Sequence, residues 1–177
     1  SVMNDEVKMH DISNKLVMGI IGDPGETIQF AQFITKNVQL YKMKNNYQLD
    51  TAAAVHFTRK TLMEALKRGT PSMVNMLVAG YDEKEGGQLY TVDFLASSVQ
   101  VPFGVHGFGG LLSLGILDRY HKPTLTEQEA YEVLKLCVNE VHSRLFVSLP
   151  NFQVKVVNKN GIKELPVICP ATFIHNK

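Results

Sequence analysis

The sequence contains no tryptophan, only two cysteines and no long apolar run. Cys137 and Cys169 form no CxxC motif and have no histidine partner at metal-ligand spacing, so they predict neither a zinc site nor a disulfide framework. No stretch approaches the roughly 20 apolar residues of a membrane span. The opening residues, SVMNDEVKMH, lack the apolar core of a secretory signal. We therefore expect an intracellular protein with free, buried thiols.

Net charge is also nearly absent, because 18 basic residues face 17 acidic ones. Without a field of one sign the chain has no electrostatic reason to bind nucleic acid or an anionic membrane. The composition, 45% hydrophobic and 20% charged, is that of an ordinary globular protein. A length of 177 residues suits one domain. We predict a single domain over 1–177 whose partners are recognised by shape.

Hydrophobic periodicity and punctuating residues divide the chain into strands and helices. Two strands are expected first, with the second, apolar on both faces, in the centre of a sheet. Asp23 and Asp50 are suited to cap the two helices that follow, and Thr126 with Glu129 forms a capping box before the last helix. The tail from Pro166 to Lys177 is expected to be extended. The predicted elements are strands at Val7–Ile12 and Leu16–Gly22, helices at Asp23–Asn46 and Asp50–Gly69, strands at Val74–Gly80 and Gln88–Phe94, a short buried helix at Leu111–Tyr120, a helix from Thr126 to Leu145, and strands at Phe152–Asn158 and Ile162–Leu165.

The order of these elements favours an α+β fold of stacked layers. Each helix pair lies between strands in the sequence. If the strands before and after a pair belong to the same sheets, the helices form outer layers over two stacked sheets. The expected architecture is therefore a four-layer α-β-β-α sandwich. No internal repeat or linker indicates a second domain.

Three local patterns suggest chemistry, and each has a simpler structural interpretation. Ser1 raises the idea of an N-terminal nucleophile, but any chain can begin with serine. GDPGET (Gly22–Thr27) lacks the lysine and spacing of a P-loop, so a turn and helix cap explain it better. GVHGFGG (Gly104–Gly110) lacks the G-x-G-x-x-G spacing of a dinucleotide site, so close backbone packing before a helix is favoured.

Titratable residues form no recognisable site either. The six histidines are scattered, with no pair at helical ligand spacing, so we predict no metal site and no cofactor. Asp82, Asp93 and Asp118 stand beside turns or caps, where turn chemistry is favoured over acid-base catalysis. The residues alone indicate an assembled α+β domain and no reaction.

A longer pattern resembles a known family. The segment LVAGYDEKEGGQLYTVDF (Leu77–Phe94) has glycine, aspartate, leucine and tyrosine at the spacing of a G-x-D then G-P-x-L-Y-x-x-D hairpin, with Gln88 in place of proline. QFAQFITKNVQLYKMKNNYQL before it and SLGILDRYHKPTLTEQEA after it also match. Over nearly the whole chain the sequence resembles the beta-type subunits of the proteasome core particle.

This resemblance implies the N-terminal-nucleophile hydrolase fold, a four-layer α-β-β-α sandwich. Gly22 resembles the glycine that lines the family's substrate cleft, and counting back from it puts Lys8 at the catalytic lysine's position. The nucleophilic threonine and its aspartate would then lie upstream of Ser1. The first strands of the domain are accordingly expected to be absent from this chain.

The same resemblance implies an inactive member. Active members place a G-S-G turn near the nucleophile, and here Phe108 stands where that serine belongs. They also carry a D-x-x-S-G segment, and here Leu145 and Leu149 replace its aspartate and glycine while Ser148 is kept. Apolar replacements remove the hydrogen bonds that orient a nucleophile. We therefore predict no catalytic residues.

As the family implies, we expect a structural subunit of the beta ring, serving ATP- and ubiquitin-dependent protein degradation in cytoplasm and nucleus. Its partners would be other beta subunits of the same and the opposite ring, alpha subunits and assembly chaperones. Two alternatives stay open. One is an active threonine protease whose nucleophile precedes this chain. The other is a small-ligand-binding module that uses GVHGFGG.

Overall fold

The computed structural model describes residues 9–145 and 151–170, without the side chain of Phe108. The elements are β1 (Met9–Ser13), β2 (Leu16–Gly22), α1 (Pro24–Asn45), α2 (Thr51–Lys67), β3 (Val74–Asp82), β4 (Gly86–Val92), β5 (Ser98–Gln100), α3 (Phe108–Tyr120), α4 (Glu127–Arg144), β6 (Phe152–Asn158) and β7 (Gly161–Ile168). Their order matches the predicted alternation, with β5 added. The chain forms two compact units, the first comprising residues up to 101 with 157–162 and the second the remainder.

The first unit contains an antiparallel sheet in the order β1-β2-β3-β4-β5. The strand predicted at Leu16–Gly22 has those bounds. It is interior, as expected, but the middle strand is β3. The predicted hairpin joins β3 to β4, where Asp82 pairs with Gly86 across the turn.

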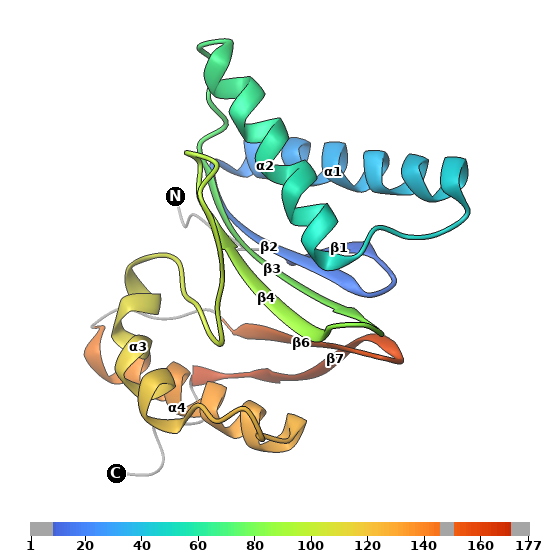
Figure 1. The fold of residues 1–177 in the computed structure, drawn as a ribbon. Helices are drawn as coiled ribbons and strands as arrows, with labels where there is room; N and C mark the ends of the chain where they lie inside the picture. The colour runs from blue at the N-terminus through green and yellow to red at the C-terminus, as the bar shows by residue number, and fades with distance from the viewer. Residues whose placement is uncertain (1–8, 146–150, 171–177) are drawn as a thin grey trace. The chain divides into compact units, whose positions relative to one another are not determined.

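Two helices cover one face of this sheet. α1 contacts β1 and β2, while α2 contacts β3 and β4 (Figure 1). Both predicted N-caps are confirmed, because the side chain of Asp23 accepts hydrogen bonds from two backbone amides of α1 and that of Asp50 accepts one from the Ala53 amide. Asn46 is the C-cap of α1 and adopts the left-handed conformation with φ 60°.

The core of the first unit lies between the helices and the sheet. Val74, Met76 and Val78 alternate along β3 and are almost completely buried. They belong to one apolar cluster with Ile34 of α1 and Leu62 of α2. The sequence period of two in the strand and the helical period in α1 and α2 therefore meet in one core.

The second unit contains α3 and α4, together with most of the β6–β7 pair. Thr126 and Glu129 form the predicted capping box, each side chain accepting a hydrogen bond from the other's backbone amide at 3.1 Å. Tyr131 and Val138 of α4 share a cluster with Val154 and other strand side chains. The Tyr131 hydroxyl donates to the Pro166 carbonyl oxygen at 2.7 Å, which ties α4 to β7.

Two expectations for the second unit need correction. The helix predicted at Leu111–Tyr120 begins at Phe108, and it is not buried, since Leu111 is 61% and Leu114 36% exposed. The apolar residues of this helix are distributed around its axis, but only one of its faces can contact α4. The last strand continues to Ile168, beyond the predicted end at Leu165, so Pro166 lies within β7. The predicted extended tail lies outside the described residues from position 171 onward.

Candidate functional site

The residues expected at a hydrolytic centre are only partly described. Ser1, Lys8, Ser148 and Leu149 lie outside the described residues. Gly22 is the last residue of β2, where it pairs with Val74 of β3. These assignments rest on the family resemblance and stay predictions.

Phe108 is the first residue of α3, directly after Gly107. Gly107 caps the helix with φ 84°, a conformation that favours glycine. A Cβ on Gly110 would lie 2.8 Å from the Cβ of Val105, closer than side-chain carbons normally approach. GVHGFGG thus has the close packing before a helix that was predicted for it.

Leu145 forms the C-cap of α4, and its N–H donates to the Val141 carbonyl oxygen at 3.0 Å. Its side chain is half-buried. An apolar side chain offers no hydrogen bond to a nucleophile or to an amine. The Leu145 side chain therefore supplies no hydrogen bond that could orient a neighbouring group.

The aspartates considered for acid-base work serve turns instead. One carboxylate oxygen of Asp82 accepts from the Glu85 N–H at 2.7 Å, and Asp93 accepts from the Leu95 and Ser97 amides at 3.0 Å. These are the Asx-type bonds expected of turn residues. Turn chemistry is therefore confirmed for Asp82 and Asp93, while Asp118 lies exposed on α3.

Cys137 is buried on α4, as expected, whereas Cys169 is partly exposed, and the two thiols are not joined in a disulfide. Burial raises the pKa of the Cys137 thiol, and a hydrogen bond with Ser113 of α3 opposes that rise. Because the thiolate is the reactive form, a raised pKa makes this thiol a poor nucleophile at neutral pH. Its place is in the packing between α3 and α4.

Metal chemistry finds no support in the described part of the chain. No group of three or more histidine, cysteine, aspartate or glutamate side chains is gathered there at metal-binding distance. Nor does any described helix have the length and apolar character needed to cross a membrane.

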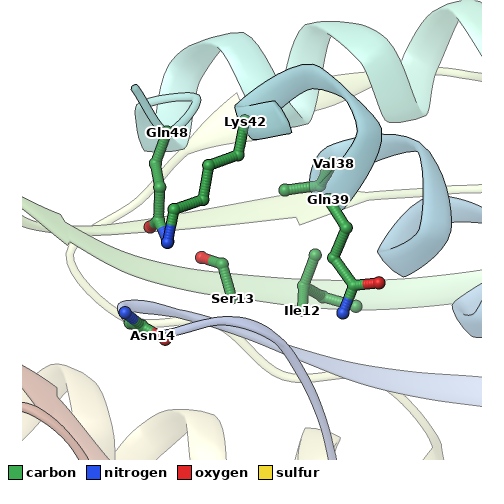
Figure 2. A pocket seen from close by; sticks show the side chains of 7 residues that line it. All are labelled: Ile12, Ser13, Asn14, Val38, Gln39, Lys42 and Gln48. Atoms are coloured by element: carbon green, nitrogen blue, oxygen red, sulfur yellow. The ribbon is translucent and has the colours of Figure 1, made fainter. Parts of the chain in front are cut away.

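Sequence reasoning missed a hollow of about 160 Å³ in the first unit, between the β1–β2 turn, α1 and the segment before α2 (Figure 2). Its floor is apolar, formed by Ile12 and Val38, both buried. Its rim includes Lys42 and Gln48, whose side chains extend toward the turn (Figure 2). No sequence signal announces it, because its residues come from three separate segments.

The helices also carry a set of exposed apolar side chains. Large apolar residues more than a third exposed occur on every helix, among them Phe33, Met43, Met63, Leu111, Leu134 and Leu136. Scattered apolar exposure is normal for proteins. Here it recurs on both helix pairs.

Comparison with known proteins identifies the class. The family model described as "Proteasome subunit" matches residues 1–157. The chain belongs to the proteasome subunit family, and the curated relatives below place it among the beta-type subunits.

Proteasome subunit beta type-2-A of Arabidopsis thaliana is 39% identical over 161 residues, covering 91% of this chain and 78% of the relative. Proteasome subunit beta type-4 of Saccharomyces cerevisiae is 35% identical over 167 residues, covering 93% and 84%. Proteasome subunit beta type-2 of Dictyostelium discoideum is 36% identical over 170 residues, covering 94% and 85%. These names agree with the resemblance of segments such as QLYKMKNNYQL and LDRYHKPTLT to beta type-2 subunits.

Proposed function

We propose that this chain is a non-catalytic structural subunit in a beta ring of the proteasome core particle, serving protein degradation in cytoplasm and nucleus. Its contribution is assembly with other beta subunits of both rings and with alpha subunits, guided by assembly chaperones. The observation that carries this proposal is the exposure of large apolar side chains on both helix pairs. Membership of the proteasome family supplies the kind of partner that would cover them.

The α1–α2 pair offers one such surface. Met43 is 76% exposed, Phe33 49% and Met63 42%. The rings of Phe33 and Phe57 stack with centroids 6.3 Å apart, joining the two helices at the surface. A neighbouring subunit that covers these side chains removes their apolar area from water. This burial stabilises the complex by roughly 25 cal/mol per Å² of apolar area.

The α3–α4 pair offers a second surface. Leu111 is 61% exposed, Leu136 42% and Leu134 40%. Obligate interfaces typically bury more than about 2,000 Å² and are rich in such side chains. We infer that the two helix pairs face the alpha ring and the opposite beta ring.

We further propose that residues 1–177 form a single four-layer α-β-β-α domain. Within the first unit, two helices cover one face of a sheet, and within the second, α4 shares a cluster with β6 and β7. Each unit thus supplies a helix layer and a sheet layer. Two helix layers and two sheet layers are the components of the fold that the resemblance implies.

The proposed lack of catalysis rests on the family resemblance, which puts Phe108 and Leu145 at positions where active members have polar groups. Lys8, at the position of the catalytic lysine, would then take no part in cleavage. The rival is an active threonine protease whose nucleophile precedes Ser1.

Assembly is tested by purifying the full-length subunit from its cell with an affinity tag and measuring the native mass of what it brings. We expect a barrel-sized particle in which peptide sequencing identifies other beta and alpha subunits. A monomer, or a complex without proteasome subunits, would overturn the proposed function.

A further inference from the structure

The hollow beside α1 plays no part in the function proposed so far. Polar side chains line its rim: Ser13 and Asn14 from the β1–β2 turn, Gln39 and Lys42 from α1, and Gln48 from the segment before α2 (Figure 2). Below them lie Ile12, 1% exposed, and Val38, 2% exposed. A hollow of about 160 Å³ with two buried apolar side chains and five polar ones around it has room for one side chain.

The rim is rich in hydrogen-bond donors and has one formal charge. Lys42 contributes an ammonium group, the three amide side chains each contribute an NH₂ group, and Ser13 contributes a hydroxyl. None of the described residues that line the hollow is acidic. The carboxylate of Asp50, two residues beyond Gln48, is already engaged at 2.7 Å by the Ala53 N–H as the cap of α2.

We propose that this hollow receives the carboxylate of an aspartate or glutamate side chain from a neighbouring proteasome subunit, with Lys42 as its charge partner. An ammonium group and a carboxylate make a charge-assisted hydrogen bond, stronger than a neutral one. The amide groups can satisfy the remaining carboxylate lone pairs. This inference rests on the proposed function, because it needs a subunit to bring the acid.

The surroundings fit a protein partner. Met43, 76% exposed, follows Gln39 by one helical turn on α1, and Leu40 and Tyr47 are 41% and 60% exposed. A subunit that covers these apolar side chains therefore reaches the rim of the hollow. Surrounding contacts that exclude water are a general feature of binding hot spots.

The hollow is also pre-shaped. The Tyr41 hydroxyl donates to the Tyr47 hydroxyl at 2.7 Å, and the two rings meet edge to face with centroids 5.5 Å apart. This contact joins α1 to the segment that carries Gln48. A segment held in place before binding loses less entropy when the partner arrives.

The test uses the assembled particle. A carbodiimide, which joins an amine to a carboxylate in direct contact, is added to particles that contain the full-length subunit. We expect Lys42 to be joined to an aspartate or glutamate side chain of another subunit. Lys44, exposed two residues away and therefore on another face of α1, is the matched control and should give no such link.

Replacement of the charge supplies a second readout. Lys42→Glu should lower incorporation into particles roughly tenfold, because like charges meet at the interface, while Lys44→Glu should incorporate as the unchanged chain does. Circular dichroism of both variants checks that they fold alike.

The two experiments distinguish failure of the proposed function from failure of this inference. If the unchanged subunit enters no particle, the proposed function fails and this inference with it. If the unchanged subunit assembles but Lys42 gives no intersubunit link and Lys42→Glu assembles normally, this inference alone is overturned. A link from Lys42 to a chain-terminal carboxylate would also overturn it, since the occupant would then be a tail.

Discussion

At the residue scale, Gly80 shows how tightly the first unit packs. A Cβ at this position would run into Thr51 Oγ1 and lie 2.8 Å from Thr51 Cγ2. Thr51 begins α2 and is only 2% exposed, so it has little room to yield. Glycine is therefore the residue that lets α2 start directly on the sheet.

Gly80→Ala should lower the free energy of unfolding by about 1–3 kcal/mol, the usual cost of overpacking. Gly87→Ala is the control, because an added Cβ there meets nothing within 4 Å. We expect that control to change stability by less than about 0.5 kcal/mol. Urea denaturation measures the stability of both variants. Equal midpoints would contradict the close packing of Gly80 against Thr51.

The Thr126 side chain secures the start of α4. Removing it in Thr126→Ala leaves the Glu129 N–H without its cap and should cost about 1 kcal/mol. Thr124, exposed in the preceding turn, provides the control variant Thr124→Ala, for which we expect almost no change. Thermal melting followed by circular dichroism measures both, and indistinguishable melting temperatures would contradict this role.

The same capping box predicts a pH dependence. Hydrogen bonds from the Thr126 backbone and then its hydroxyl hold the pKa of Glu129 below its usual value. A lowered folded-state pKa means that this stabilisation is complete above the unfolded pKa of about 4.3. It is lost as the pH falls through the folded value.

Glu129→Gln keeps a hydrogen-bonding side chain but cannot titrate, so its stability should fall less between about pH 5 and pH 3 than that of the unchanged chain. The urea midpoints of both chains, measured across this pH range, show whether the variant loses less stability than the unchanged chain. A parallel fall in both chains would show that Glu129 does not contribute.

At the element scale, α2 separates stability from assembly on two neighbouring residues. Leu62 is fully buried, whereas Met63 is 42% exposed. Leu62→Ala should lower the free energy of unfolding by about 2–5 kcal/mol, because it leaves a cavity in the core. Met63→Ala should leave unfolding nearly unchanged and instead weaken incorporation into particles. Urea denaturation and native mass spectrometry give the two readouts, and the reverse pattern would contradict the assignment of faces.

Elements with local signals were predictable from the sequence. Asp23, Asp50 and Thr126 indicate helix starts, because a cap is a hydrogen bond between residues that are close in sequence. β5 was missed because it spans only Ser98–Gln100, too short for a period to show. The burial predicted for α3 was wrong because an apolar composition does not distinguish a core helix from a helix with exposed apolar side chains.

At the scale of the whole molecule, the candidate sites were less predictable than the fold. The family resemblance suggested Lys8, Phe108 and Leu145 as positions that matter for catalysis. The structure adds only that Phe108 is the first residue of α3 and that Leu145 is the C-cap of α4. The donor-lined hollow depends on Asn14, Lys42 and Gln48 meeting in space. That meeting follows from tertiary structure and has no spacing that a sequence could reveal.

The central claim, that this family member assembles without cleaving, is tested most directly by intact-mass measurement of every subunit after the particle is treated with a peptidyl electrophile directed at N-terminal threonine. We predict that this subunit keeps its unmodified mass while other beta subunits of the same particle gain the mass of the adduct. An adduct on the amino-terminal residue of this subunit would contradict the claim and make it an active threonine protease.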